Sequence, residues 1–169
     1  MVRELVAALL ALGASGCSLV LDFSDQAIPK DASPDAPFDA ADCAYKEPDD
    51  SVATAAAISL SDTGPAAICP GATEDHDFYR FTVPAAATRV EIRVDTVFRP
   101  GGDLDLRLYD GAGATVLAQS HSFSDEERIV CPGSVPACPA LAAGDYVFEV
   151  LPAVTGAVNR YTFTLAIAP

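Results

Sequence analysis

Residues 75–84 read DHDFYRFTVP, and this stretch gives the first indication of the fold. Its apolar residues Tyr79, Phe81 and Val83 alternate with polar neighbours. Successive side chains of a β-strand point to opposite faces, so this alternation places the apolar side chains on a buried face and the polar ones in water. The stretch therefore predicts a half-buried strand, which ends at the turn residue Pro84.

The same period of two recurs four more times along the chain. The later stretches are residues 90–94, 104–108, 146–150 and 161–167. Glycines and prolines lie between them, where turns need a positive or a fixed φ. No convincing amphipathic helix separates them. At least five half-buried strands in succession predict an all-β fold, an antiparallel, jelly-roll-like β-sandwich.

Four short sequence motifs, in a fixed order, are typical of a known family. They are EPDDS at 47–51, DHDFYRFTVP at 75–84, GDLDLRLYD at 102–110, and AGDYVFEV at 143–150 followed by YTFTLAI. This series resembles the bacterial pre-peptidase C-terminal (PPC) domain family, small β-sandwiches appended to secreted proteases and other exported proteins. The resemblance implies an extracellular accessory module and not a catalyst.

The resemblance also implies a calcium site. Some members of the family bind Ca²⁺ with acidic residues at the start of the domain and before the aromatic strand. Carried over to this chain, the candidate ligands are Glu47, Asp49, Asp50, Asp75 and Asp77. Carboxylate oxygens suit Ca²⁺, which takes a flexible shell of hard oxygen ligands. The alternative is that Asp49 or Asp50 caps a turn while Asp75 and Asp77 are solvated residues at a strand end.

The N-terminus is typical of export. Arg3 precedes an apolar run over residues 5–12, which is too short to span a bilayer, and small residues continue to Cys17. Residues 14–17, ASGC, resemble a bacterial lipobox, which implies a signal peptide over residues 1–16 and a lipidated Cys17. Ser18 then favours an outer-membrane address. The alternative is an ordinary secretory signal with an incidental cysteine.

After the signal peptide, the sequence predicts a tether and then a single domain. Residues 25–42 are rich in Asp, Ala and Pro, so they bury too little apolar surface to offset the entropy of ordering. We therefore predict a disordered, acidic tether over residues 17–42. Residues 18–50 hold nine acids against two lysines, a net charge of −7 and half of the chain's −14. Residues 43–169 are long enough for one core, the β-sandwich domain.

Four cysteines remain in the domain, an even number that favours disulfides in an exported protein. Three connectivities are formally possible. We favour Cys131 with Cys138, because the residues between them form a compact loop, which leaves Cys43 to pair with Cys69. The alternative is a zinc site, which the spacings do not favour because they contain no CxxC pair.

Composition and the absence of known catalytic motifs argue against two classes of function, nucleic-acid binding and catalysis. Ten basic residues against 24 acids leave no basic stripe for nucleic acid. The chain lacks GxSxG, HExxH and a glycine-rich phosphate loop, so we predict no enzymatic activity. His121 lies in QSHSFSDEER (119–128), where a surface histidine and a solvated loop at Glu126 and Glu127 are expected.

Two functions remain for a lipid-anchored or secreted protein of the bacterial cell envelope. The first is a binding module that docks an extracellular polymer or a partner envelope protein, with calcium as its cofactor. Exposed aromatic residues would favour it. Most aromatic residues fall on expected core positions, and Phe98 and Phe123 are the ones expected to lie outside the core. The second is a structural module without a ligand, which assists the folding or secretion of a partner.

Overall fold

The computed structural model describes residue 38 and residues 42–71, 74–97 and 101–169. The predicted signal peptide, the lipidation site at Cys17 and all of the tether except Phe38 and Asp42 lie outside the described residues, as does Phe98. None of the described residues belongs to a helix with the length and apolarity needed to cross a membrane. The only helical turn in the described part is the 3₁₀ turn η2 (Asp42–Ala44).

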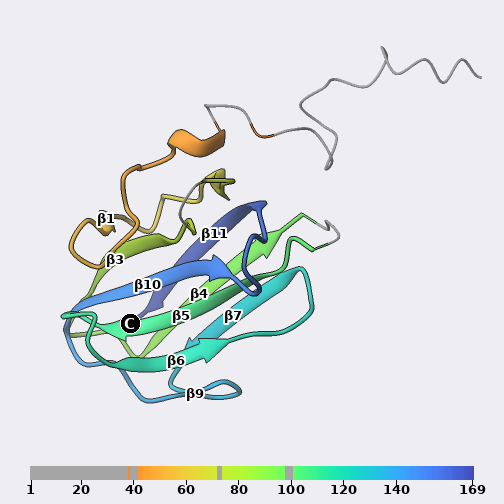
Figure 1. Ribbon diagram of the computed structural model, residues 1–169. Helices are drawn as coiled ribbons and strands as arrows, with labels where there is room; N and C mark the ends of the chain where they lie inside the picture. Colours follow the sequence, from red (N-terminus) through yellow and green to blue (C-terminus); the bar gives the residue numbers. More distant parts are fainter. Residues whose placement is uncertain (1–37, 39–41, 72–73, 98–100) are drawn as a thin grey trace, which may run out of the picture.

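Two β-sheets face one another and form the predicted sandwich (Figure 1). One sheet has the order β1-β3-β10-β5-β6 and the other has the order β2-β11-β4-β7. Neighbouring strands are antiparallel, except that β1 runs parallel to β3. The first sheet comprises β1 (Ala56–Ala57), β3 (Asp77–Val83), β10 (Gly144–Pro152), β5 (Leu104–Asp110) and β6 (Val116–Ser120). The second comprises β2 (Ala66–Ile68), β11 (Asn159–Ala168), β4 (Arg89–Thr96) and β7 (Glu126–Cys131), and a small hairpin pairs β8 (Gly133–Ser134) with β9 (Ala137–Cys138).

All five strands expected from the alternation are confirmed, as β3, β4, β5, β10 and β11. Their alternate apolar side chains form the core between the sheets. At its centre the ring of Tyr79 of β3 packs against those of Phe148 of β10 and Phe163 of β11, with ring centroids 5.0 and 4.8 Å away, and these two phenylalanines also contact each other at 5.7 Å. Such tilted aromatic pairs join the two sheets across the core and add to the free energy of apolar burial.

Strand β10 is buried on both faces, which its alternation alone does not predict. It is the middle strand of its sheet, between β3 and β5. On its outer face Val147 is fully buried and Glu149 is 3% exposed. The Glu149 carboxylate accepts a 2.6 Å hydrogen bond from Tyr109 of the neighbouring strand, and its other oxygen lies 2.6 Å from Nδ1 of His76. The guanidinium of Arg107 lies 3.6 Å from the oxygen that Tyr109 contacts, so the buried carboxylate has both hydrogen-bond and ion-pair partners.

The expectation of a solvated loop at Glu126 and Glu127 is wrong. Both residues open strand β7, which pairs with β4. Glu127 shares the inward face of this strand with Ile129 and is 1% exposed. One of its carboxylate oxygens accepts hydrogen bonds from the backbone N–H and the hydroxyl of Ser122, at 2.9 and 2.6 Å. Sheet pairing therefore overrides the polar character of this stretch.

Both expected disulfides are confirmed. Cys43 in η2 joins Cys69, which follows β2, with 6.0 Å between the Cα atoms. Cys131 at the end of β7 joins Cys138 in β9, with 5.0 Å between the Cα atoms. The first bond ties the N-terminal segment to the sandwich, and the second closes the β8–β9 hairpin.

Candidate metal centre

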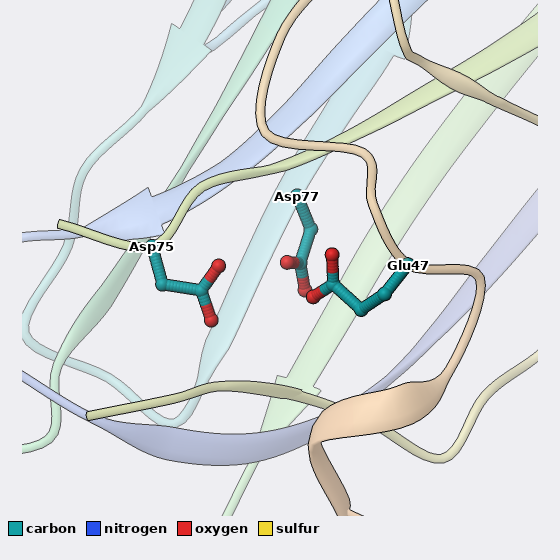
Figure 2. Close-up of side chains that lie close together, drawn as sticks. All are labelled: Glu47, Asp75 and Asp77. Atoms are coloured by element: carbon teal, nitrogen blue, oxygen red, sulfur yellow. The ribbon is translucent and has the colours of Figure 1, made fainter. Parts of the chain in front are cut away.

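Three of the five predicted ligands converge on one point. Glu47 comes from the N-terminal arm (residues 42–50), while Asp75 precedes β3 and Asp77 opens it. Each offers one carboxylate oxygen, and these oxygens all lie within 4.8 Å of one another. Figure 2 shows the three carboxylates turned toward a shared space between the arm and the start of β3. The expected juxtaposition of the arm with the DxD sequence is therefore present.

Asp49 lies beside this cluster and is fully buried, at 0% exposed. Its backbone carbonyl accepts a 3.0 Å hydrogen bond from the N–H of Phe78. Its own N–H donates to Oε2 of Glu47 at 3.2 Å. Neither of its carboxylate oxygens meets a hydrogen-bond donor within the described part of the chain. A charged group buried in this way is costly unless a cation or a proton neutralises it.

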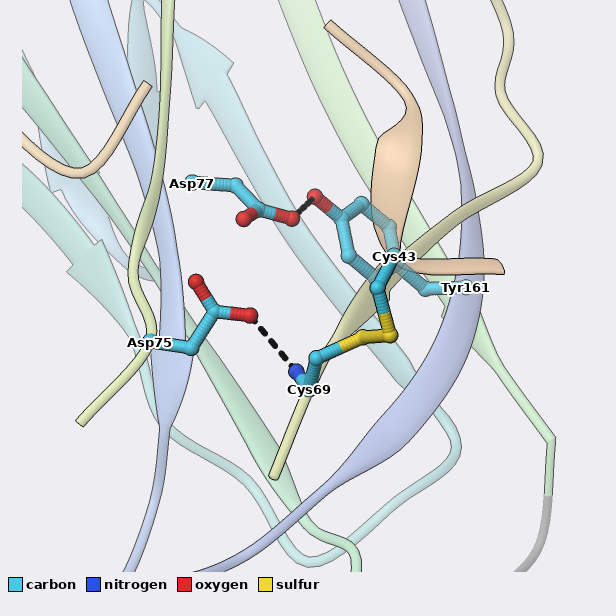
Figure 3. The surroundings of a disulfide bond; sticks show 5 residues. All are labelled: Cys43, Cys69, Asp75, Asp77 and Tyr161. Carbon is cyan, nitrogen blue, oxygen red and sulfur yellow. Dashed lines mark hydrogen bonds between the residues drawn. A yellow bond between two sulfur atoms is a disulfide. The ribbon is translucent and has the colours of Figure 1, made fainter. Parts of the chain in front are cut away.

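Asp77 is 3% exposed, and only one of its carboxylate oxygens has a partner among the described residues. The hydroxyl of Tyr161 donates to Oδ2 of Asp77, and Figure 3 shows this contact. The Tyr161 hydroxyl also lies 2.7 Å from that of Tyr79. Burial raises the pKa of both tyrosines, so their hydroxyls remain protonated donors. The Oδ1 atom of Asp77 is left free for a ligand.

The electrostatics of the centre oppose ionisation of its acids. Burial, with the charges of Glu47 and Asp75, raises the pKa of Asp49 to about 8. Burial also raises the pKa of Asp77 to about 9, against the hydrogen bond from Tyr161. The pKa of Asp75 rises to about 6, chiefly through burial, although the 2.6 Å hydrogen bond from the N–H of Cys69 lowers it. Carboxylates without basic partners raise one another's pKa.

Asp50 is exposed and does not join the three convergent oxygens. Its charge still raises the pKa of Asp49 and Asp75. The structure therefore brings Glu47, Asp75 and Asp77 together, places Asp49 against them in the interior, and leaves Asp50 at the rim. Unpaired buried oxygens beside three convergent ones are a donor set that fits a hard cation such as Ca²⁺.

Known proteins with a similar sequence motif or a similar structure support the assignment of the fold. Residues 75–151 match the family model described as bacterial pre-peptidase C-terminal domain. This chain carries a PPC-like β domain. The fold is also similar to the crystal structure of the pre-peptidase C-terminal domain of collagenase from Bacillus anthracis, with a TM-score of 0.50 and 16% identity. That match covers 65% of this chain and 92% of the other. No curated protein matches the sequence.

The matched range of the PPC-like domain includes Asp75 and Asp77 but begins after the N-terminal arm. The sequence analysis missed the groups that orient these two aspartates, namely the Tyr161 hydroxyl and the backbone N–H of Cys69. Tyr161 lies on the same inward face of its strand as the core residues Phe163 and Leu165, and therefore looks purely structural from the sequence. A backbone donor leaves no signal in a sequence. Only the folded chain places both beside the acids.

Proposed function

We propose that this protein is a non-enzymatic cell-envelope lipoprotein whose PPC-like domain binds calcium and docks an extracellular polymer or a partner protein. The observation that supports calcium most is the buried Asp49, which has no donor for either carboxylate oxygen and lies against the convergent Glu47, Asp75 and Asp77. Ca²⁺ takes roughly six to eight oxygen ligands, so backbone carbonyls or water would complete its shell.

Calcium at this centre would order the junction between tether and sandwich. Glu47 and Asp49 belong to the N-terminal arm, whereas Asp75 and Asp77 belong to the start of β3. In the absence of a cation, the like charges of these segments repel one another. A bound cation replaces that repulsion with shared coordination, and so fixes the direction in which the tether leaves the domain.

A docking surface is supported by one exposed aromatic side chain. Phe123, in the loop between β6 and β7, is fully exposed, as expected from the sequence. Every other aromatic residue that the structure describes is buried or half-buried. An exposed phenylalanine at a loop tip is a candidate anchor for a partner surface. The packing of the other aromatics favours the second candidate, a stabilising module without a ligand.

The side-chain contacts support a non-catalytic role. In the part of the chain that the structure describes, the recorded polar side-chain partners of His76 are the carboxylates of Glu149 and Glu74, and not a hydroxyl or thiol nucleophile. A cleft of about 400 Å³ lies between the edges of β3 and β11, and no acidic or basic side chain lines it. Neither place offers the nucleophile and base that hydrolysis needs.

The test compares calcium with EGTA. Thermal melts of the purified protein in millimolar Ca²⁺ and in EGTA should differ by several degrees, because a ligand that binds only the folded state stabilises it by RT ln(1 + [L]/Kd). Asp75→Asn with Asp77→Asn should abolish the difference. The control variant, Asp125→Asn with Glu126→Gln, removes the same charge from a distant exposed site and should retain it. Coincident wild-type melts without any calorimetric heat of Ca²⁺ binding would rule out the calcium site.

Capture of a partner from envelope extracts separates the two functions. The wild-type protein should retain a specific polymer or protein in calcium, and Phe123→Ala should weaken this retention while leaving the melting temperature unchanged. Retention that is absent in both calcium and EGTA would favour the stabilising module.

A further inference from the structure

We propose that the Cys43–Cys69 disulfide assembles the candidate metal centre, so that oxidation of this bond and binding of the cation favour each other. The inference rests on the proposed calcium function and concerns its regulation. A protein with reduced Cys43 and Cys69 would bind the cation weakly. The centre would therefore load after oxidative folding, in an oxidising compartment, and remain largely empty in a reducing one.

The metal centre is built from two segments that are distant in sequence. Glu47 and Asp49 belong to the N-terminal arm, whereas Asp75 and Asp77 lie at the start of β3. The disulfide spans a sequence separation of 26 residues and joins the arm, through Cys43, to Cys69, which lies just after β2 and six residues before Asp75 in the sequence. Figure 3 shows the disulfide next to Asp75 and Asp77. The crosslink therefore raises the effective concentration of one half of the centre at the other.

The disulfide also acts on a ligand directly. The backbone N–H of Cys69 donates a 2.6 Å hydrogen bond to Oδ2 of Asp75, drawn as a dashed line in Figure 3. The crosslink holds the backbone at Cys69, and this backbone fixes the orientation of the Asp75 carboxylate. Cys69 is thus a positioning residue for the centre, in addition to its covalent role.

Among the described residues, the arm is also held by noncovalent contacts, including a 3.3 Å hydrogen bond from Lys46 to the carbonyl of Ala57. The N–H of Phe78 bonds to the carbonyl of Asp49 at 3.0 Å, and Lys46 forms a 3.5 Å ion pair with Asp62 at the surface. The ring of Tyr45 packs 6.4 Å from that of Phe163. Against these contacts stands the repulsion between the carboxylates of the arm and those at the start of β3, whose oxygens lie within 4.8 Å of one another at Glu47, Asp75 and Asp77. Once the bond is reduced, this repulsion favours release of the arm from β3.

Thermodynamic linkage makes the effect reciprocal. Reduction by a dithiol transfers two hydrogens to the sulfurs of Cys43 and Cys69, while the dithiol becomes a cyclic disulfide. If oxidation raises the affinity for calcium by a given factor, calcium must shift the dithiol–disulfide equilibrium of this bond by the same factor. The Cys131–Cys138 bond lies away from the acids, at the end of β7, and should not respond.

The first experiment measures calcium affinity by calorimetry in three forms of the full-length protein. Cys43→Ser with Cys69→Ser should weaken binding at least tenfold. Cys131→Ser with Cys138→Ser, which also removes one disulfide, should change it less than twofold. A Cys43→Ser, Cys69→Ser protein that folds by circular dichroism and binds calcium as tightly as the wild type would overturn the inference.

The second experiment uses only wild-type protein and remains decisive if the cysteine variant fails to fold. The protein is equilibrated in buffers of reduced and oxidised dithiothreitol, with Ca²⁺ or EGTA, and alkylated thiols are mapped by mass spectrometry. Calcium should shift the equilibrium of Cys43–Cys69 at least tenfold toward the disulfide and leave Cys131–Cys138 unchanged. Asp75→Asn with Asp77→Asn should abolish the shift. Equal shifts at both bonds, or none in a protein that binds calcium, would refute the coupling, whereas a wild type that binds no calcium refutes the proposed function itself.

Discussion

Asp49 is the residue of the N-terminal arm whose negative charge is most strongly disfavoured by its surroundings. It is fully buried, and neither carboxylate oxygen meets a donor among the described residues. With an ordinary pKa near 3.8 it would be charged at neutral pH, but burial raises its pKa to about 8. A proton or a cation can therefore neutralise this side chain, and the two compete for it.

The pH dependence of the metal-free protein follows from these pKa values. Asp49 and Asp77 have folded-state pKa values of about 8 and 9, above their ordinary 3.8. At pH values between the unfolded-state pKa and these raised folded-state pKa values, the folded protein retains protons that the unfolded chain releases. The free energy of unfolding should therefore fall as pH rises from about 4 to about 9. Calcium should flatten this fall, because it stabilises the ionised carboxylates.

Urea denaturation in EGTA and in Ca²⁺ at pH 5, 7 and 9 measures this dependence. Asp49→Asn provides the control, because an amide does not titrate and the fall in EGTA should become smaller. A free energy of unfolding in EGTA that stays constant or rises over this range would show that the acids are solvated and ionised throughout.

At the scale of elements, the strands with strict alternation were predictable and the others were not. Strands β3, β4, β5, β10 and β11 each bury alternate apolar side chains, and a period of two reveals such strands directly. Strand β7 begins with two glutamates, and β1 has only two residues, so tertiary pairing defines both. At the candidate metal centre the family resemblance led to the expected convergence of Glu47, Asp75 and Asp77, whereas Asp50 lies outside it. The groups that orient the convergent acids, at Tyr161 and Cys69, depend on the fold.

Two phenylalanines test the assignment of core and surface. Phe163 of β11 is fully buried and contacts Tyr79 and Phe148, whereas Phe123 is fully exposed. Phe163→Ala should lower the free energy of unfolding by about 3–5 kcal/mol, because it removes buried apolar surface and leaves a cavity. Phe123→Ala should change it by less than about 0.5 kcal/mol. Chemical denaturation of both variants measures the difference, and equal effects would contradict the sandwich packing.

At the scale of the whole molecule, charge is concentrated near the N-terminal side of the domain. Residues 18–50 carry a net charge of −7 out of −14 for the chain. Like charges extend a linker and repel it from an anionic surface. Because an acidic protein is repelled by an anionic membrane surface, we propose that a covalent lipid at Cys17 supplies its membrane attachment.

Cys17→Ser tests the anchor. The variant should move from the membrane fraction to the soluble fraction, because the acyl chains supply the only membrane affinity that this acidic protein is proposed to have. Ser18→Ala changes the neighbouring residue and should leave the protein in the membrane fraction. Mass spectrometry of the wild type should find Cys17 as the first mature residue, carrying the mass of its lipid. Unchanged fractionation of Cys17→Ser, or a different mature N-terminus, would favour the ordinary secretory signal and would make the protein a secreted module without an anchor.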